Sequence, residues 1–246
     1  MQEITSINNQ LVKETVKLQQ KKYRDSGNEF LLEGFKPLKE AVDAGIEIKY
    51  VFVQKEKADK YSFLTHNLIL VNDAVLKKIS TTDTPPEAVG VGVQKHFDIS
   101  DLKNAKKLVL LENIRDLGNL GTILRSAVAF KADGVVLYGD CADLYNPKCV
   151  RSTVGNLWKI PVVKLNKLDN IFDDFQRVAT LPRTDNLLKN FKPKEKVLLM
   201  FGSEADGLSE ELINYSTDSV KIEMSESVES LNLSVSCAIA MYELFV

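Results

Sequence analysis

Hydrogen-bonding side chains are crowded into the stretch ENIRDLGNLGTILRSA, which runs from Glu112 to Ala127. They belong to Asn113, Arg115, Asp116, Asn119 and Arg125, with Gly118 and Gly121 between them. The apolar run KLVLLEN leads into this stretch, and apolar residues at helical spacing follow it. Polar groups between a strand and a helix add nothing to an apolar core, so this junction is a candidate for binding or catalysis.

Two further polar clusters follow apolar strands in the second half of the chain. GSEADGLSEEL comes after VLLMF, and SESVESLNLSVS comes after SVKIEM. Because the carboxyl ends of neighbouring parallel strands meet at one edge of a sheet, the three clusters are expected to form one site. Each cluster alone also has a structural explanation. Gly202 and Gly207 can serve turns, and Ser230 can cap the last helix.

Several common chemistries lack their signatures in this chain. The nearest match to GxGxxG is GVGVQK, and there is no GK[ST] phosphate loop and no GxSxG elbow. The only histidines are His66 and His96, and no CxxC pair occurs. We therefore expect no metal site, and we expect Cys141, Cys149 and Cys237 to be reduced core residues. A cofactor held by loop backbone and apolar side chains fits the clusters better.

Length and charge set wide limits on the function. The chain has 246 residues and a formal net charge of −2. This length corresponds to one or two domains, and such a small net charge does not by itself predict a nucleic-acid partner. No apolar run is long enough to span a bilayer, and MQEITSINNQ lacks the apolar region of a signal peptide. We therefore expect no membrane partner and a cytoplasmic location.

The second half of the chain predicts an α/β domain with a mostly parallel sheet. Its strands are expected at KLVLLEN, DGVVLYG, IPVVKL, RVAT, VLLMFG and SVKIEM. Continuous Val/Leu/Ile runs of this kind are typical of strands covered by helices on both faces. The helix after the first strand has one apolar stripe, made of Leu120, Ile123, Leu124, Ala127 and Val128.

The first half predicts a smaller α/β domain, residues 1–94. Strands are expected at EFLLEG, IKYVFVQ, LILV and AVGVGVQ, and helices near residues 8–22, 36–44 and 72–79. The polar stretch KHFDISDLKNAK has no clear period. It is predicted to be a linker, residues 95–106, that leads into the domain of residues 107–246.

The last helix, SLNLSVSCAIAMYELFV, is apolar on two faces. One face holds Leu233, Cys237, Ala240, Met241 and Leu244, and the other holds Val235, Ile239, Tyr242 and Phe245. A helix that is apolar nearly all round is covered on more than one side. The second cover is predicted to be another copy of the chain, in a homodimer.

The segment LVKETVKLQQKKYR is strongly basic. Lys13, Lys17 and Lys21 recur every four residues and are expected to line one helix face. Two interpretations remain open for this face. It is either a solvated surface or a surface that contacts RNA phosphates.

The three clusters of the second half carry a family resemblance. NIRDLGNLGTILRSA, FGSEADGLSEE and IEMSESVESLNLSVSCA resemble, in order and spacing, the three motifs of the TrmH/SpoU family of SPOUT-superfamily RNA methyltransferases. KYRDSGNEFLLEG resembles the ribosomal-protein-like, RNA substrate-binding domain that often precedes them. The resemblance implies methylation of a ribose 2′-hydroxyl by S-adenosylmethionine, in rRNA more than in tRNA. It also implies a deep trefoil knot in the C-terminal domain and a dimer with its sites at the subunit interface.

The resemblance further implies roles for individual residues. The catalytic residues would be Asn119, Arg125, Ser230 and Asn232, with the last two near the transferred methyl group or holding Asn119. The cofactor would contact Gly202, Ile222 and Leu231, RNA would contact Arg115, and Glu204 would be structural or face the substrate at the interface. Independently of the resemblance, the basic face of Lys13, Lys17 and Lys21 is the other candidate for contact with RNA. Arg125 is expected to orient the ribose and stabilise the developing alkoxide, because a guanidinium stays protonated and makes a poor base.

Three residues depart from the family pattern. Leu117 and Glu223 each replace a proline, and Glu226 replaces a common glycine. A cofactor loop without its proline is looser, and Glu226 places negative charge near a positively charged sulfonium. The competing hypotheses are a non-catalytic RNA-binding or ribosome-assembly factor on the same scaffold, a tRNA ribose methyltransferase, and a small-molecule enzyme. The last of these would need no basic second domain.

Overall fold

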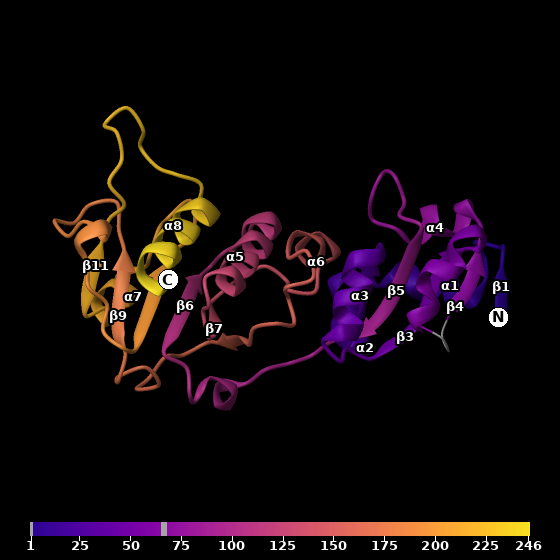
Figure 1. Ribbon diagram of the computed structural model, residues 1–246, viewed down its shortest axis with the longest axis horizontal. Coiled ribbons are helices and arrows are strands. Elements are labelled where there is room, and N and C mark those ends of the chain that lie inside the picture. The colour runs from indigo at the N-terminus through magenta and orange to yellow at the C-terminus, as the bar shows by residue number, and fades with distance from the viewer. Residues whose placement is uncertain (1, 65–67) are drawn as a thin grey trace. The chain divides into compact units, whose positions relative to one another are not determined.

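Two compact units make up the part of the chain that the computed structural model describes, residues 2–64 and 68–246 (Figure 1). The N-terminal unit consists of Met1–Lys95 together with Asp143–Trp158. The C-terminal unit consists of His96–Ala142 and Lys159–Val246. No local pattern in the sequence indicates that Asp143–Trp158 groups with the first 95 residues. The domain limits drawn from the sequence, at 94 and 107, stay a prediction.

The N-terminal unit contains a five-stranded sheet in the order β1-β4-β3-β5-β2. The strands are β1 (Gln2–Ile4), β2 (Glu29–Glu33), β3 (Ile48–Gln54), β4 (Leu68–Val71) and β5 (Ala88–Val93). β1, β4 and β3 pair in parallel, and β5 pairs antiparallel with both β3 and β2. The helices are α1 (Gln10–Lys17), α2 (Lys21–Gly27), α3 (Phe35–Asp43), the 3₁₀ segment η1 (Lys55–Leu64), α4 (Asp73–Ile79) and α6 (Pro147–Ser152).

The prediction of one continuous helix over residues 8–22 is wrong, because the chain breaks into α1 and α2. Gln20 is extended, with φ −102° and ψ 134°, so Lys21 starts a new helix and does not continue the row of Lys13 and Lys17. The reason lies in the Arg24 side chain, which is 1 % exposed. It donates to the Leu18 carbonyl at 2.8 Å, a group freed by the end of α1, and forms an ion pair with Asp143.

The C-terminal unit contains a six-stranded sheet in the order β11-β9-β10-β6-β7-β8, and every neighbouring pair is parallel. The strands are β6 (Lys107–Glu112), β7 (Gly134–Tyr138), β8 (Val162–Leu165), β9 (Gln176–Thr180), β10 (Val197–Phe201) and β11 (Asp218–Val220). The helices are η2 (Ile99–Leu102), α5 (Leu117–Ala129), η3 (Leu188–Asn190), α7 (Glu210–Tyr215) and α8 (Leu233–Phe245). This confirms the predicted α/β class and parallel sheet.

Both faces of the central strands are buried, as their continuous apolar sequences predicted. Leu108 and Leu110 of β6 pack in a cluster with Phe172, Phe175 and Leu212. Successive side chains of a strand point to opposite faces, so the intervening residues of β6 face the other side. There α5 and α8 pack against each other (Figure 1).

Helix α8 begins later than its sequence indicated. Its N-cap is Asn232, whose side chain accepts from the Ser234 amide at 2.9 Å, so Ser230 is not the cap. The predicted second apolar face is also partly corrected. Phe245 is 2 % exposed and belongs to the core, because it lies at the edge of the buried side formed by Cys237, Ala240, Met241 and Leu244. Val235, Ile239 and Tyr242 are exposed.

No helix among residues 2–64 and 68–246 is long and apolar enough to cross a bilayer. Cys141, Cys149 and Cys237 form no disulfide within residues 2–64 and 68–246; the last two are buried and Cys141 is half-buried. Burial raises the pKa of the Cys237 thiol well above its ordinary value. Cys149 and Cys237 are therefore core residues, as predicted.

Candidate functional site

The three polar clusters emerge from neighbouring elements of the C-terminal unit. β6 and β10 are adjacent parallel strands, so the segments that follow them leave the sheet at the same edge. The first segment enters α5 and the second forms the loop 202–208. The third cluster leads into α8, which packs against α5 (Figure 1). The expected convergence of the clusters is thus built into the topology.

A chain of hydrogen bonds joins the three clusters at the start of α5. Asn119 Nδ2 donates to Glu204 Oε1 at 2.6 Å. Asn232 Nδ2 donates to Asn119 Oδ1 at 3.1 Å. Both the nitrogen and the oxygen of the Asn119 amide are therefore hydrogen-bonded. Their partners lie 85 and 113 positions further along the chain. A primary amide carries two N–H donors, so one N–H of Asn119 is left for a ligand.

Capping interactions hold this chain in place. Asp116 is the N-cap of α5, and its carboxylate accepts from the Asn119 amide N–H at 2.7 Å. Asn232 caps α8 in the same way and also accepts from the Ser234 hydroxyl at 2.6 Å. Both amides of the site thus lie at or beside helix N-termini, where partial positive charge favours an electron-rich ligand.

Asn113 is polar for a structural reason. It has a positive φ of 54°, and its side-chain oxygen accepts from the Asp140 amide at 2.8 Å. Gly139, with φ 73°, makes room for that contact, because a Cβ there would lie 2.3 Å from Asn113 Oδ1. Asn113 therefore fixes the turn after β7. This explains part of the polar crowd between β6 and α5.

Glu112 ties the first two clusters together, and the sequence analysis missed it. Its side chain is almost fully buried at the end of β6 and accepts from the Ser209 amide at 2.8 Å. Ser209 is the N-cap of α7, so the carboxylate holds the end of the loop 202–208 against the end of β6. The available signal was a carboxylate that closes an otherwise apolar strand.

Gly202 is required by the loop itself. A Cβ at this position would lie 1.9–2.1 Å from backbone atoms of Gly207 and Leu208. Ser203 and Gly207 exchange two backbone hydrogen bonds, of 3.1 and 3.0 Å, and Gly207 has φ 68°. The loop 202–208 therefore closes on itself, and only glycine fits at its base.

The segment 221–232 supplies apolar surface next to these polar groups. Ile222 and Leu231 are both half-buried, near its two ends, and Ser230 is exposed. Glu223 forms an ion pair with Lys189, and both side chains are more than half exposed. Of the two acidic departures from the family pattern, only Glu226 keeps an exposed carboxylate with no ion pair among the residues described.

The arginines of the first cluster are not part of the hydrogen-bond chain. Arg115 pairs with Asp140 at 3.4 Å, with both side chains more than three-quarters exposed. Such an exposed ion pair contributes little free energy, so Arg115 is available to a ligand. Arg125 is exposed on α5 and has no ion pair within residues 2–64 and 68–246. Six residues separate it from Asn119, which is about 240° around the helix, so the two side chains leave α5 on different faces.

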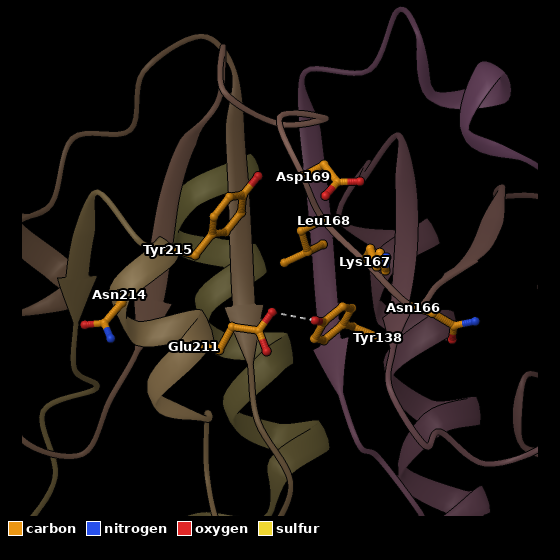
Figure 2. Close-up of a pocket in the computed structure, with 8 residues that line it drawn as sticks. All are labelled: Tyr138, Asn166, Lys167, Leu168, Asp169, Glu211, Asn214 and Tyr215. Carbon is orange, nitrogen blue, oxygen red and sulfur yellow. Dashed lines mark hydrogen bonds between the residues drawn. The ribbon is translucent and has the colours of Figure 1, made fainter.

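A separate pocket lies on the opposite face of the sheet, beside α7 (Figure 2). Its volume is about 560 Å³, and it is lined by Tyr138, Asn166, Lys167, Leu168, Asp169, Glu211, Asn214 and Tyr215. The Tyr138 hydroxyl donates to Glu211 at 2.7 Å, and this hydrogen bond, together with burial, raises the pKa of Tyr138 to about 12. None of the predicted site residues lines this pocket.

No group of three or more metal-ligating side chains occurs within residues 2–64 and 68–246. His66 lies outside the described residues.

Comparisons with protein families match both halves of the chain. Residues 106–242 match the SpoU rRNA methylase family. Residues 9–90 match the MRM3-like substrate binding domain.

Similar proteins cover nearly the whole chain. An uncharacterized tRNA/rRNA methyltransferase of Synechocystis is 32 % identical over 98 % of this chain and 92 % of its own length. The 23S rRNA (guanosine(2553)-2′-O)-methyltransferase of Bacillus subtilis is 30 % identical over 99 % of both chains.

Two solved structures with bound S-adenosylmethionine (AdoMet) have the same fold. The AdoMet-bound rRNA methyltransferase of Sinorhizobium meliloti superimposes with a TM-score of 0.86 at 32 % identity, over 98 % of this chain and 96 % of that one. The SpoU methyltransferase AviRb of Streptomyces viridochromogenes, in complex with AdoMet, gives a TM-score of 0.86 at 26 % identity, over 96 % and 97 %.

Proposed function

Because the chain belongs to the SpoU rRNA methylase family, we propose that its three-cluster site transfers a methyl group to a ribose 2′-hydroxyl of rRNA. Family membership makes it an S-adenosylmethionine-dependent methyltransferase, and the 23S rRNA 2′-O-methyltransferases among its relatives give the substrate class. The observation that carries the assignment to this site is the hydrogen-bond chain from Glu204 through Asn119 to Asn232.

The residues around the loop 202–208 fit a nucleoside cofactor. Half-buried Ile222 and Leu231 offer apolar contact to an adenine ring, and the closed loop at Gly202 offers backbone groups. Glu223, which replaces the proline of the family pattern, forms an exposed ion pair with Lys189. We propose that Gly202, Ile222 and Leu231 hold S-adenosylmethionine, which supplies an electrophilic methyl carbon on a positively charged sulfur.

In the reaction, the ribose 2′-oxygen bonds to the methyl carbon while the carbon–sulfur bond breaks, and the hydroxyl proton passes to water. We propose that the unengaged N–H of Asn119 donates to the 2′-oxygen and positions it for in-line attack. Glu204 and Asn232 fix the plane of the Asn119 amide, and Ser230, exposed two residues before Asn232, contacts the same ribose. Arg115 contacts the RNA backbone beside it.

Arg125 leads us to propose a homodimer. It leaves α5 on a different face from Asn119, and it has no ion pair within the described part of its own chain. Val235, Ile239 and Tyr242 form an exposed apolar face on α8, and Tyr242 meets Phe130, just after α5, with ring centroids 5.7 Å apart. An apolar surface of this kind is a usual site of protein association. We propose that it forms a two-fold interface, across which Arg125 completes the site of the partner subunit.

The knot, the location and the RNA are further parts of this proposal. The segment 218–221 pairs with residues 178–180 and 186–188, with Leu188 N donating to the Lys221 carbonyl at 2.8 Å, before the chain returns to α8. A segment held against this part of the chain fits a knotted C-terminal region. Three cysteines with no disulfide within residues 2–64 and 68–246, together with an rRNA substrate, favour a cytoplasmic enzyme. The alternative of a non-catalytic factor keeps its basis in Glu226, and the ion pair between Glu223 and Lys189 gives the loop that lacks its proline one anchor.

Calorimetry with S-adenosylmethionine tests the cofactor assignment. We expect saturable binding with a Kd below the millimolar range, weakened when Leu231 is changed to Asp. Gly202→Ala is not a suitable test, because the loop would not close around a methyl group. No heat at millimolar cofactor, from a folded protein, would contradict the assignment and leave the non-catalytic alternative.

A further inference from the structure

Two lysine side chains lie close to the ring of Tyr23 on the surface of the N-terminal unit. The Nζ atom of Lys17, at the end of α1, is 5.7 Å from the ring centroid, and that of Lys22, in α2, is 5.6 Å from it. The break between α1 and α2 brings these residues together. Tyr23 is half-buried, and its hydroxyl has no hydrogen bond within the described residues.

In the part of the chain that the structure describes, the lysines around Tyr23 have no carboxylate partners. Lys13, Lys17, Lys21 and Lys22 are exposed, and none of them forms an ion pair within residues 2–64 and 68–246. The nearest acidic residue on α1, Glu14, accepts a hydrogen bond from Gln10 instead. Four unpaired positive charges, two of them within 6 Å of one aromatic ring, match a polyanion that also carries aromatic groups.

A second cluster of aromatic and basic residues in the same unit differs, because its lysines have carboxylate partners. Phe35 and Phe63 meet edge to face, and Lys60 lies 4.9 Å from the centroid of Phe35. Lys60, however, is paired with Glu87, and Lys39 beside Phe63 is paired with Asp43. Its charges are already neutralised, so it has little attraction for phosphates.

We propose that Tyr23 stacks on an unpaired nucleobase of the RNA substrate, while the lysines around it neutralise the flanking phosphates. The proposal rests on the proposed function for its ligand, and it names the class of RNA as single-stranded or looped. An exposed cation–π contact is worth about 0.5–1 kcal/mol, whereas stacking of a base on an aromatic ring is worth about 1–3 kcal/mol. Phosphates can therefore draw the ammonium groups away and free the ring face for a base.

The test measures binding of the full-length protein, without cofactor, to a labelled 12-nucleotide single-stranded RNA and to an RNA duplex of equal length. Tyr23→Leu should weaken single-strand binding about 5- to 150-fold, the range that corresponds to one stacked base. Its salt dependence should stay unchanged. Tyr23→Phe should bind like the wild type, because it keeps the ring. Phe63→Leu is the matched control in the other cluster and should also bind like the wild type.

Unlike Tyr23→Leu, substitution of the lysines should change the salt dependence of binding. Changing Lys17 and Lys22 to Gln should lower the slope of log K against log salt by about 0.7 for each phosphate of a single strand that the variant no longer neutralises. Fluorescence of Trp158, the only tryptophan, reports whether each variant keeps the N-terminal unit folded.

Two results would overturn the stacking role. In the first, a folded Tyr23→Leu protein binds single-stranded RNA with an affinity within twofold of the wild type. In the second, Tyr23→Leu loses the same affinity for the single strand and for the duplex. Neither result bears on methyl transfer, which is measured separately. A wild-type protein that binds RNA as described but transfers no methyl group would instead contradict the proposed function.

Discussion

The side-chain nitrogen of Asn119 lies 2.6 Å from Oε1 of Glu204, at the start of helix α5. The two residues come from different strand ends, so this bond exists only when the loop 202–208 and α5 are both in place. It fixes which end of the Asn119 amide points toward Glu204, since the other end accepts from Asn232. A positioned donor beside a reacting oxygen is the feature that the proposed mechanism needs.

Replacing Asn119 with Asp should disable methyl transfer without emptying the cofactor site. The new carboxylate would face Glu204 and would no longer offer an N–H to the ribose. Loss of one such donor lowers the rate by about 100- to 1000-fold. Single-turnover methyl transfer measures the rate, and calorimetry should give an unchanged cofactor affinity. Asn214→Asp, in the pocket of Figure 2, is the control and should react normally. A wild-type rate from Asn119→Asp would remove Asn119 from the mechanism.

The exposed face of α8 should hold two chains together. Ile239→Glu places a charge on that face and should convert a dimer into monomers in sedimentation at micromolar concentration. Ile213→Glu is a matched control, because Ile213 is 37 % exposed on α7 and Ile239 is 39 % exposed on α8. The interface assignment fails if the wild type is already monomeric, or if both variants dissociate equally.

Arg125 should act on the site of the partner subunit. Heterodimers of one Asn119→Ala chain and one Arg125→Ala chain can be purified after coexpression with two different tags. If the site is shared, each heterodimer has one intact site and one with both changes, so it should keep about half of the wild-type rate. Each homodimeric variant should be nearly inactive. A heterodimer as inactive as its parents would show that both residues serve one protomer.

The N-terminal unit should lose stability at high pH through Tyr145. This residue is 4 % exposed, and burial raises its pKa from 10.0 to about 12. In the folded state the Tyr145 hydroxyl stays protonated up to about pH 12, whereas in the unfolded state it ionises near pH 10. The free energy of unfolding is therefore highest below pH 10 and falls as the pH rises from 10 to 12. The loss is about 2–3 kcal/mol.

The comparison with Tyr145→Phe isolates this effect. The variant loses the hydrogen bonds of the Tyr145 hydroxyl with the Lys95 backbone, 2.7 and 2.5 Å long, and should be about 1–3 kcal/mol less stable at pH 8. Urea unfolding, followed by Trp158 fluorescence, measures the free energy of unfolding of both proteins. The difference between the wild type and Tyr145→Phe should disappear near pH 11.5. A difference that stays constant with pH would contradict the buried, neutral state of Tyr145.

Much of the C-terminal unit could be predicted from its sequence. The runs around Leu108 and Leu198 are apolar without interruption because both faces of their strands are buried, and this is visible in any short window. The convergence of Asn119, Glu204 and Asn232 followed from placing three clusters at the ends of parallel strands. The bond partners within the site did not follow, since they depend on loop geometry.

Other features depend on contacts that no local pattern contains. The break before Lys21 exists because Arg24 is buried against Asp143, which is 119 residues away in the chain. The same contact helps to hold the segment 143–158 to the N-terminal unit. Glu112 looked like the end of a strand, and only its bond to Ser209 gives it a role. Arg125 carries the right chemistry, but helical geometry separates it from Asn119, and a single chain does not bring them together.

The position of the methyl group in the product distinguishes ribose methylation from base methylation. Unmodified rRNA is incubated with methyl-labelled S-adenosylmethionine and the protein, and the RNA is then hydrolysed in alkali. Alkaline cleavage uses the ribose 2′-oxygen as the nucleophile, so a methylated 2′-oxygen blocks cleavage at that nucleotide. We predict that the label appears in alkali-resistant dinucleotides from one site, and that Asn119→Asp lowers its rate of appearance by about 100- to 1000-fold. Label in mononucleotides, which indicates methylation of a base, or no label at all from a protein that binds both cofactor and RNA, would contradict this prediction.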